Sequence, residues 1–361
     1  MKTNNKRIEY IDGHRGIAIL LVILFHAYSR WPELLPYGNA FGEFPLFKQG
    51  WIGVELFFLV SGFVILMTLE KCSTPKQFLY RRWIRLFPAM LICTIIIFAT
   101  SGFFFERPAG SPTWSSILPG LTFVEPSWWR LLTGQKVNGI EGAFWSLYVE
   151  FKFYVFAAVI YYWKGRDAFF RSLIFVFAVA AAVRLAEKFF GGANLKILDS
   201  VLSTLSFRYF GWFASGAAFY LFTKNGLMKW FYFALAIAFA SAVNEGGVDW
   251  QKIVAGLIVA VFFASSVISE TIQKILSFRL FLFVGAISYP LYLIHENMMV
   301  SIIIKLGKNF ESIPLILLPF PAVFFLGLAA YAIYRYAEPF TKSILAMRTG
   351  KNPMLPRIEG K

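Results

Sequence analysis

The chain has 361 residues, of which 58% are hydrophobic and only 15% are charged. A soluble domain is nearer half apolar and a quarter charged, so this composition argues against a soluble protein and indicates a lipid environment. The formal net charge of +15 does not indicate nucleic-acid binding, because Lys and Arg lie in short loops where they set membrane topology. Cys72 lies beside a basic loop and Cys93 inside an apolar run, so we expect two free thiols.

Apolar runs recur along nearly the whole chain, and each is long enough to cross a hydrocarbon core of about 30 Å at 1.5 Å per residue. We therefore predict an all-α protein, a polytopic bundle of about ten transmembrane helices. The first run resembles a signal peptide, but no small-residue cleavage site follows it, so it should stay as the first helix. The predicted helices cover residues 16–29, 51–69, 88–105, 143–163, 169–188, 205–222, 228–243, 253–268, 280–298 and 314–334.

The segment 106–142 is rich in Pro, Gly and Trp and is too polar and broken to span a membrane. We expect it to cap one face of the bundle, with Trp114, Trp128 and Trp129 at the lipid interface. Lys and Arg concentrate in one alternating set of connections, so the positive-inside rule predicts an even number of spans with both termini cytoplasmic. Residues 1–345 should form one integral membrane domain, with no appended soluble domain, and residues 346–361 a basic cytoplasmic tail.

Ionisable residues inside a membrane span are costly and usually functional, so they are the first candidates for a site. The first predicted helix carries Arg15 at its cytoplasmic start and His26 eleven residues later. Eleven residues are close to three helical turns, so both side chains should share one face, about 16 Å apart along the axis. An isolated His on an apolar helix is often a core residue, but its alignment with Arg15 favours a functional role.

Two further spans carry a glutamate. Glu55 precedes the small residues Ser61 and Gly62, which would let another helix or a ligand approach closely. Glu150 and Tyr154 are spaced i, i+4 and are predicted to form a hydrogen-bonded pair. Lys152 is a poor partner for Glu150, because side chains two residues apart on a helix do not face each other. This spacing favours a functional Glu150 over a structural ion pair.

Because alternate spans run in opposite directions, four titratable groups should converge on the outer half of the bundle. They are His26, Glu55, Glu150 and His295. Arg82 and Arg85, three residues apart, should lie at the inner face and point the same way, which suits bidentate contacts to phosphate. Topology alone would explain the charge of this pair, but it does not require Arg rather than Lys.

In these features the chain resembles the bacterial membrane acyltransferase-3 family, whose members O-acylate surface polysaccharides and related acceptors. No single motif is specific, but their order and spacing together are. The segments that carry the resemblance are Tyr10–Gly16 with His26, Glu55–Phe63, Arg82–Arg85, Phe144–Tyr154, Ile287–His295 and Glu338–Phe340.

The resemblance implies an acyltransferase domain in residues 1–345 and an acyl-CoA donor, usually acetyl-CoA, that enters from the cytoplasm. His26 and Arg15 match the family's essential His and Arg, and Arg82 and Arg85 are implied to act as well. The chain departs from the family at three places. The family commonly has Leu at the position of His14, often Asp at that of Glu55, and often a second Glu or Gln at residues 151–152.

The predicted geometry is compatible with this chemistry. Phosphates of coenzyme A held by Arg15, Arg82 and Arg85 would leave the thioester one pantetheine arm deeper, near His26. His26 would act as a general base on the acceptor hydroxyl, with Glu150 or Tyr154 orienting the imidazole or the acceptor, or it would carry the acyl group itself. We assign Glu55, Ser61, Trp145 and His295 to the acceptor side, and we expect no tightly bound cofactor.

We therefore expect the protein to transfer an acyl group, usually acetyl, in the bacterial inner membrane. The acceptor would be a hydroxyl of a cell-surface carbohydrate or of its lipid-linked precursor. A proton-coupled transporter or a flippase of lipid-linked sugars is the main alternative, because buried His and Glu also suit transport. A metal site of His14, His26 and His295 is disfavoured, because His14 should lie on the opposite side of the bilayer. A purely structural scaffold would not explain the alignment of Arg15 with His26.

Overall fold

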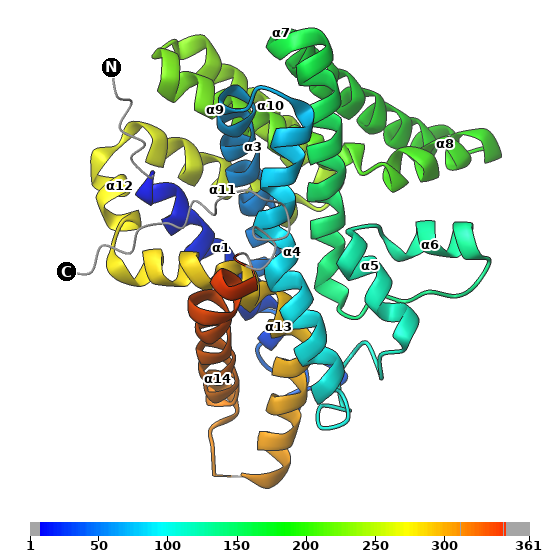
Figure 1. The fold of residues 1–361 in the computed structure, drawn as a ribbon, viewed down its shortest axis with the longest axis vertical. Helices are drawn as coiled ribbons and strands as arrows, with labels where there is room; N and C mark the ends of the chain where they lie inside the picture. The colour runs from blue at the N-terminus through cyan, green and yellow to red at the C-terminus, as the bar shows by residue number, and fades with distance from the viewer. Residues whose placement is uncertain (1–7, 311, 342, 344–361) are drawn as a thin grey trace. The chain divides into compact units, whose positions relative to one another are not determined.

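The computed structural model describes residues 8–310, 312–341 and 343, and every regular element within these residues is helical (Figure 1). The all-α class is therefore confirmed. Seven of the described helices are long and apolar enough to cross a membrane by length and composition. The count of about ten spans and the cytoplasmic termini stay predictions, and the basic tail lies outside the described residues.

Each of the ten predicted segments corresponds to a helix. The long helices are α1 (Glu9–Tyr28), α3 (Gly53–Lys71), α4 (Pro75–Thr100), α7 (Trp145–Phe190), α9 (Phe210–Asn225), α10 (Met228–Gly246), α11 (Trp250–Ile268), α13 (Arg279–Asn309) and α14 (Pro319–Ala332). Shorter helices are α2 (Pro45–Lys48), α5 (Ile117–Thr122), α6 (Pro126–Thr133), α8 (Ala193–Thr204) and α12 (Glu270–Leu276). Single turns are η1 (Gly50–Ile52), η2 (Trp114–Ser116), η3 (Gly142–Phe144), η4 (Phe207–Tyr209), η5 (Leu315–Leu317) and the π-helical η6 (Ile333–Ala337).

Helix α7 contains two of the predicted segments. Its 46 residues would extend about 69 Å if straight, more than twice the thickness of a hydrocarbon core. Gly165 breaks it with φ 82°, a backbone conformation that residues with a Cβ rarely adopt. The predicted break between residues 163 and 169 is thus confirmed.

The predicted start of the third helix was wrong. We expected it near Pro88, but α4 begins at Pro75 and continues through Pro88. Two reciprocal hydrogen bonds mark the start of this helix. The Thr74 hydroxyl accepts one from the backbone N–H of Gln77 at 3.2 Å, and the Gln77 side chain accepts one from the backbone N–H of Ser73 at 2.9 Å. This arrangement resembles a capping box followed by a proline in the first turn, where proline is favoured.

The segment 106–142 contains only short helices, of which α6 with eight residues is the longest. None of them is long enough to cross a bilayer, as predicted. The Trp114 side chain is 78% exposed and that of Trp128 is 39% exposed. Their position at a lipid interface stays a prediction.

The described residues form two compact units. Unit 1 contains residues 8–25, 43–80 and 145–285, and unit 2 contains residues 26–42, 81–144, 286–310, 312–341 and 343. In unit 1, α3 packs against α9, α9 against α10, and α10 against α11. Large fully buried side chains, including Phe63, Phe153, Trp212 and Phe213, fill the space among its helices.

Glycines set the close crossing of α3 and α9. A Cβ at Gly62 would lie 2.1 Å from the carbonyl oxygen of Phe213, and a Cβ at Gly216 would lie 2.0 Å from that of Leu59. Neither helix backbone could approach so closely if these residues carried side chains. The prediction that small residues near Ser61 admit another helix is confirmed.

In unit 2, α4 and α13 are tied together by polar as well as apolar contacts. The Tyr289 hydroxyl of α13 donates to the carbonyl oxygen of Leu86 in α4 at 3.1 Å. Cys93 is buried as a free thiol, and so is Cys72 in unit 1, as predicted.

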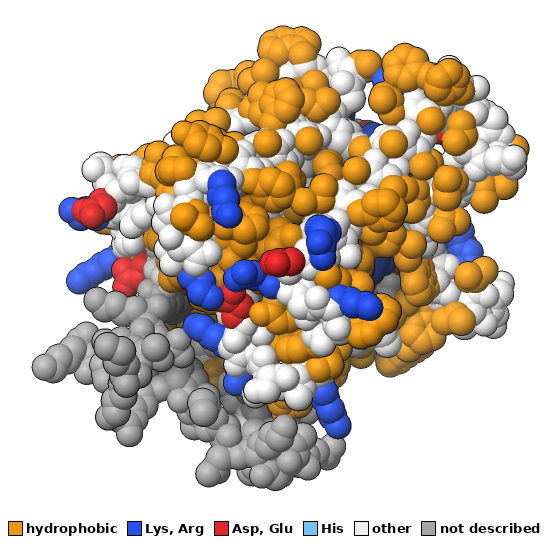
Figure 2. All heavy atoms as spheres, turned by 90° about the horizontal axis from the view of Figure 1, so that it is seen from above, with side chains coloured by type: hydrophobic (Ala, Val, Ile, Leu, Met, Phe, Trp, Pro, Cys, Tyr) orange, Lys and Arg blue, Asp and Glu red, His pale blue; other side chains and the backbone are white. Residues whose placement is uncertain are grey.

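Apolar side chains also cover much of the molecular surface. Figure 2 shows one face on which hydrophobic side chains predominate, with Lys, Arg and a few acidic side chains among them. Such extended apolar surface is rare on soluble monomers and is typical of proteins in contact with lipid. The chain is therefore a multi-pass membrane protein by length, composition and surface.

Candidate active site

The candidate site in unit 2 is built around His26, in the last turn of α1, and two adjacent residues of α13. The Nε2 atom of His295 lies 3.3 Å from Nδ1 of His26, and the two rings meet edge to face with centroids 4.9 Å apart. Oε1 of Glu296 lies 3.5 Å from Nε2 of His26. The His26 side chain is 12% exposed and that of Glu296 is 4% exposed. An imidazole thus has a neighbour at each ring nitrogen in a largely dry environment.

The hydrogen-bond partners assign the protons of this group. His295 Nδ1 lies 2.8 Å from the carbonyl oxygen of Tyr292, and a carbonyl can only accept, so His295 carries its proton on Nδ1. Its Nε2 is then an acceptor, and His26 donates to it from Nδ1. In the neutral His26 ring this leaves Nε2 as the basic nitrogen, next to the Glu296 carboxyl.

Backbone groups hold the Glu296 carboxyl in place. Oε2 of Glu296 accepts from the N–H of Ala143 at 2.6 Å, and the Tyr292 hydroxyl donates to the carbonyl oxygen of Ala143 at 2.8 Å. A Cβ at Gly142 would lie 2.9 and 3.1 Å from the two carboxyl oxygens of Glu296. Only glycine leaves room for the carboxyl at this position.

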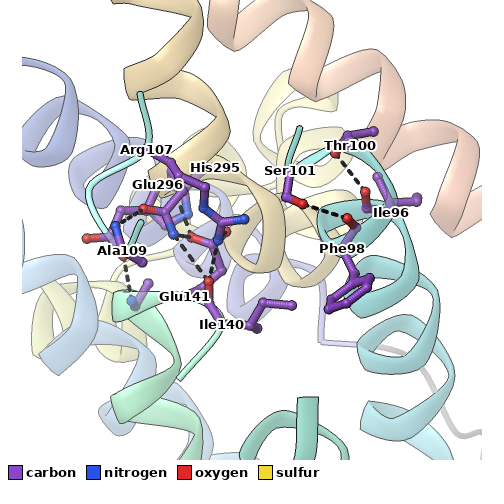
Figure 3. Close-up of polar contacts among 12 residues, drawn as sticks. Ile96, Phe98, Thr100, Ser101, Arg107, Ala109, Ile140, Glu141, His295 and Glu296 are labelled. Carbon is purple, nitrogen blue, oxygen red and sulfur yellow. Dashed lines mark hydrogen bonds and ion pairs between the residues drawn. The ribbon is translucent and has the colours of Figure 1, made fainter. Parts of the chain in front are cut away.

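A second polar group anchors the segment 106–142 to α13 (Figure 3). Nη2 of Arg107 lies 3.2 Å from Oε1 of Glu141 and also donates to the carbonyl oxygen of Ile140. Asn297 donates from its side-chain amide and its backbone N–H to Oε2 of Glu141, and it accepts from the N–H of Ala109 at 3.0 Å. Asn297, the residue after Glu296, therefore forms hydrogen bonds near both ends of the segment 106–142.

The same anchoring continues along α13. The Ser301 hydroxyl donates to Oε2 of Glu106 at 2.8 Å, and Nζ of Lys305 lies 3.2 Å from Oε1. Asn297, Ser301 and Lys305 are each four residues apart, so they form one stripe along a face of the helix. Partial burial raises the pKa of Glu106, but the bonds from Ser301 and Lys305 outweigh it and hold the pKa below its ordinary value.

The Arg107 and Glu141 side chains are only 2% and 1% exposed. Burial raises the pKa of the Glu141 carboxyl, and the pKa stays raised, at about 8, although the guanidinium of Arg107 acts in the opposite direction. Removal of either partner alone leaves an uncompensated polar group in a dry site.

Sequence reasoning predicted only part of this group. The sequence predicted that His26 and His295 lie at the same end of the bundle, and in the structure the two side chains are in contact. It missed Glu296, although an acid inside an apolar run is the same signal that selected Glu55 and Glu150. Arg107 and Glu141 gave no such signal, because they lie in an irregular segment.

The predicted Glu150 and Tyr154 pair is confirmed, and both residues belong to unit 1. Oε1 of Glu150 accepts from the Tyr154 hydroxyl and, at 2.6 Å, from the hydroxyl of Ser61. Lys152 bonds elsewhere, to the carbonyl oxygen of Thr204 and at 3.1 Å to the Ser206 hydroxyl. Glu150 therefore joins α3 to α7, and its assigned catalytic role stays a prediction.

Two acceptor-side candidates also lie in unit 1. Glu55 is 2% exposed, and its Oε2 atom has no hydrogen-bond partner among the described residues. Phe58, on the next turn of α3, has its ring centroid 6.3 Å from that of Trp145 and 5.5 Å from that of Tyr209. The Trp145 side chain is 40% exposed. The acceptor-side roles of Glu55 and Trp145 stay predictions.

The three arginines assigned to the donor lie on helices. Arg82 and Arg85 are both within α4, which confirms the i, i+3 spacing on which their shared direction depends. Arg82 is buried and Arg85 is partly exposed. Arg15 and His26 belong to the same helix α1, as expected, and the shared direction of their side chains stays a prediction. No described contact tests the binding of phosphate.

His14 has a structural environment in unit 1. Its Nε2 atom lies 2.7 Å from the Ser266 hydroxyl, and its ring stacks on Phe263 with centroids 4.8 Å apart. In the part of the chain that the structure describes, no group of three or more His, Cys, Asp or Glu side chains is arranged as metal ligands.

Comparison with known proteins identifies the family. Residues 8–334 match the model of the acyltransferase-3 family, which is described as an acyltransferase domain. The peptidoglycan O-acetyltransferase OatA of Listeria monocytogenes is 24% identical over 329 residues, which are 81% of this chain and 49% of that protein. An O-acetyl transferase of Shigella phage Sf6 is 27% identical over 157 residues, which are 41% of this chain and 44% of that protein.

The chain thus spans less than half the length of either relative. No solved structure is significantly similar to it.

The buried Arg107 and Glu141 pair yields a test by double-mutant cycle. Arg107→Gln alone should lower the free energy of unfolding by about 3–5 kcal/mol, because it leaves the Glu141 carboxyl buried without its cation. The double variant Arg107→Gln with Glu141→Gln should recover a large part of that loss. Thermal unfolding of the detergent-solubilised protein measures both, and strictly additive effects of the two substitutions would show that the pair is not coupled.

Proposed function

This chain belongs to the acyltransferase-3 family, and from that premise we propose that it is a membrane O-acetyltransferase. It takes an acetyl group from acetyl-CoA at the cytoplasmic face of the bacterial inner membrane. It transfers the group to a hydroxyl of a cell-surface carbohydrate or of its lipid-linked precursor. The observation that carries the proposal is the His26 imidazole with Glu296 beside Nε2 and His295 beside Nδ1. The names of the two relatives, both O-acetyltransferases, support the choice of acetyl group and hydroxyl acceptor.

The proposed step is general-base catalysis. His26 Nε2 takes the proton of the acceptor hydroxyl while that oxygen attacks the carbonyl carbon of the thioester. The carbon–sulfur bond then breaks, the acetyl group stays on the acceptor oxygen, and the proton on His26 is available to the departing thiolate. His295 keeps Nε2 of His26 unprotonated and basic by accepting a hydrogen bond from the Nδ1–H of His26.

Glu296 has the position of a stabilising carboxylate in this step. When His26 takes up a proton it becomes an imidazolium, and the Oε1 atom 3.5 Å away can compensate that charge. The interaction is strong because the site is largely dry. Glu296 would also support the alternative in which His26 carries the acetyl group. Detection of an acetyl-histidine or ping-pong kinetics would favour that alternative over the general-base step.

The donor side of the proposal rests on arginines. Arg15 lies eleven residues before His26 in α1, about 16 Å away along the helix axis. The pantetheine arm of coenzyme A is long and thin, so phosphates held by Arg15, Arg82 and Arg85 would leave the thioester deep in the membrane. The planar guanidinium suits phosphate because it offers paired donors.

The first prediction concerns the base. His26→Ala should lower transfer of labelled acetyl from acetyl-CoA by at least about 100-fold, since general-base catalysis contributes on the order of 10²–10⁴. Membrane insertion should be retained, and thermal unfolding measures any loss of stability separately, because the His26 side chain is only 12% exposed. Full activity in His26→Ala would remove the proposed mechanism.

A second prediction concerns the placement of Glu296. Gly142→Ala puts a Cβ 2.9 Å from one carboxyl oxygen, so the carboxyl must shift and transfer should fall by about 10- to 100-fold. Gly139→Ala is the matched control in the same segment, because its Cβ would meet the nearest atom at an ordinary 3.4 Å. Steady-state rates of acetyl transfer are measured for both variants. Equal rates for Gly142→Ala and Gly139→Ala would mean that the placement of Glu296 has no role in transfer.

A third prediction concerns the donor. Arg85→Lys keeps the charge but loses the paired donors, so it should raise the KM for acetyl-CoA by about tenfold. Arg166→Lys is the control, because Arg166 is an exposed residue next to the break in α7, and its ion pair with Asp167 at 3.6 Å lies at the surface. If both substitutions change KM equally, Arg85 serves topology rather than donor binding.

A further inference from the structure

The loop that follows α1 brings an unused hydrogen-bond donor to the candidate site of unit 2. Trp31 lies five residues after His26, and the Nε1–H of its indole is close enough to the Glu296 carboxyl to act on it. This nitrogen is buried, yet it has no hydrogen-bond partner of ordinary geometry among the described residues. An indole N–H can only donate, and a buried donor without an acceptor is costly. Beside a catalytic base, such a donor is expected to find its acceptor in the substrate.

The loop itself holds Trp31 in place. The carbonyl oxygen of Trp31 accepts from the backbone N–H groups of Leu34 and Leu35, each at 3.1 Å. A Cβ at Gly307 would lie 2.7 Å from Cγ of Pro36, so the loop packs closely against α13, the helix that carries Glu296. A donor that is fixed before the substrate binds needs no rearrangement during the reaction.

Arg30 places a positive charge over the same indole. Cζ of its guanidinium lies 4.6 Å from the centroid of the Trp31 ring, a cation–π contact. The cation draws electron density from the ring, which makes the indole N–H a better donor. Arg30 also interacts electrostatically with the Glu296 carboxyl. Topology does not explain this cation, because Arg30 follows the end of α1 that we predict to be outer, whereas topology signals gather on the cytoplasmic side.

Other donors near Glu296 are bound to protein groups. The backbone N–H of Ala143 donates to Oε2 of Glu296 at 2.6 Å. Arg107 also acts on Glu296, but Nη2 of its guanidinium lies 3.2 Å from Glu141. Nε of Arg107 has no partner among the described residues, yet turning it toward a substrate would break that buried pair. Trp31 can donate without giving up a hydrogen bond.

The proposed reaction creates a negative charge that needs such a donor. When the acceptor oxygen bonds to the carbonyl carbon of the thioester, the π electron pair of the C=O bond moves onto the carbonyl oxygen. The acceptor oxygen lies within about 3 Å of Nε2 of His26 and about 3–3.5 Å from that carbon before attack. The oxyanion therefore forms in the neighbourhood of Glu296, whose Oε1 is 3.5 Å from the same Nε2. The two negative charges would repel each other unless a donor and a cation faced the oxyanion.

We propose that the Nε1–H of Trp31 donates to the carbonyl oxygen of the thioester and stabilises the oxyanion that forms there, with Arg30 strengthening the bond. This inference rests on the proposed function, because the thioester is its donor substrate. The hydrogen bond strengthens as the oxygen gains charge, so it lowers the barrier more than it tightens binding. When the intermediate collapses, the electron pair returns to the C=O bond, the carbon–sulfur bond breaks and the thiolate takes the proton from His26.

Infrared spectroscopy of the bound donor tests this hydrogen bond directly. Acetyl-CoA labelled with ¹³C at the carbonyl carbon is bound to the full chain in detergent without acceptor, and the isotope shift identifies its C=O stretch. A hydrogen bond weakens the C=O bond and lowers this frequency. The frequency should be lower in the wild-type protein than in Trp31→Phe, which keeps an aromatic ring but has no N–H. Equal frequencies overturn the proposal, and they are the result expected if Trp31 only orients Glu296.

Kinetics measure the size of the effect. Trp31→Phe should lower kcat by about 100-fold or more, as for the loss of one oxyanion donor, while the KM for acetyl-CoA changes little. Trp114→Phe is the matched control, because the Trp114 side chain is 78% exposed, and it should leave kcat and the C=O frequency unchanged. A loss in Trp31→Phe that falls on KM alone contradicts the proposal.

A second replacement covers the case in which Trp31→Phe does not fold. Benzothienylalanine, introduced at residue 31 alone, has nearly the shape of tryptophan but carries sulfur in place of the N–H. It should raise the C=O frequency and lower kcat in the same way as Trp31→Phe. An unchanged frequency and rate with this replacement would also overturn the proposal.

His26→Ala separates this inference from the proposed function. The variant should lose acetyl transfer but keep the low C=O frequency, because the hydrogen bond from Trp31 does not involve His26. Activity in His26→Ala counts against the proposed mechanism, and acetyl-CoA that does not bind counts against the mechanism and this inference together. A C=O frequency that does not depend on Trp31 counts against this inference alone.

Discussion

The contact between the His26 imidazole and the Glu296 carboxyl is the interaction around which unit 2 is organised. A carboxyl in a dry site is costly unless donors face it. Here the Ala143 N–H donates to one oxygen, the other lies 3.5 Å from Nε2 of His26, which becomes a donor when His26 is protonated, and Gly142 leaves the space. These requirements fix the backbone just before α7, although no residue there has a side chain that takes part in chemistry.

The anchoring of the segment 106–142 follows from the same constraint. A loop placed next to a buried carboxyl must satisfy its own polar groups without water. Asn297, Ser301 and Lys305 do so from one face of α13, with Arg107 and Glu141 as a buried pair between them. The segment is therefore irregular in conformation but well determined in position. Removing either charge would loosen the backbone that places Glu296.

The sequence predicted the helices well because a transmembrane helix needs a long apolar run. The length of such a run can be read from the sequence without knowing its tertiary contacts. It failed at Pro75, where polar residues of a cap, rather than apolar periodicity, begin the helix. In the site, His26 and His295 were visible as ionisable groups in apolar runs. Arg107 and Glu141 were not, because their burial comes from contacts with α13 that no local pattern encodes. Glu296 was within reach, because an acid inside an apolar run is the signal that selected Glu55 and Glu150.

Hydrogen-bond capacity distinguishes the two glutamates that compete for the catalytic role. Oε1 of Glu150 already accepts from Ser61 and Tyr154, and each bond stabilises the carboxylate where it is. Such a group already has its hydrogen-bond partners and serves to link α3 with α7. Oε1 of Glu296 has Nε2 of His26 at 3.5 Å, longer than a strong hydrogen bond, and therefore keeps capacity for a protonated imidazole or a substrate. This difference favours Glu296 over Glu150 as the carboxylate that works with His26.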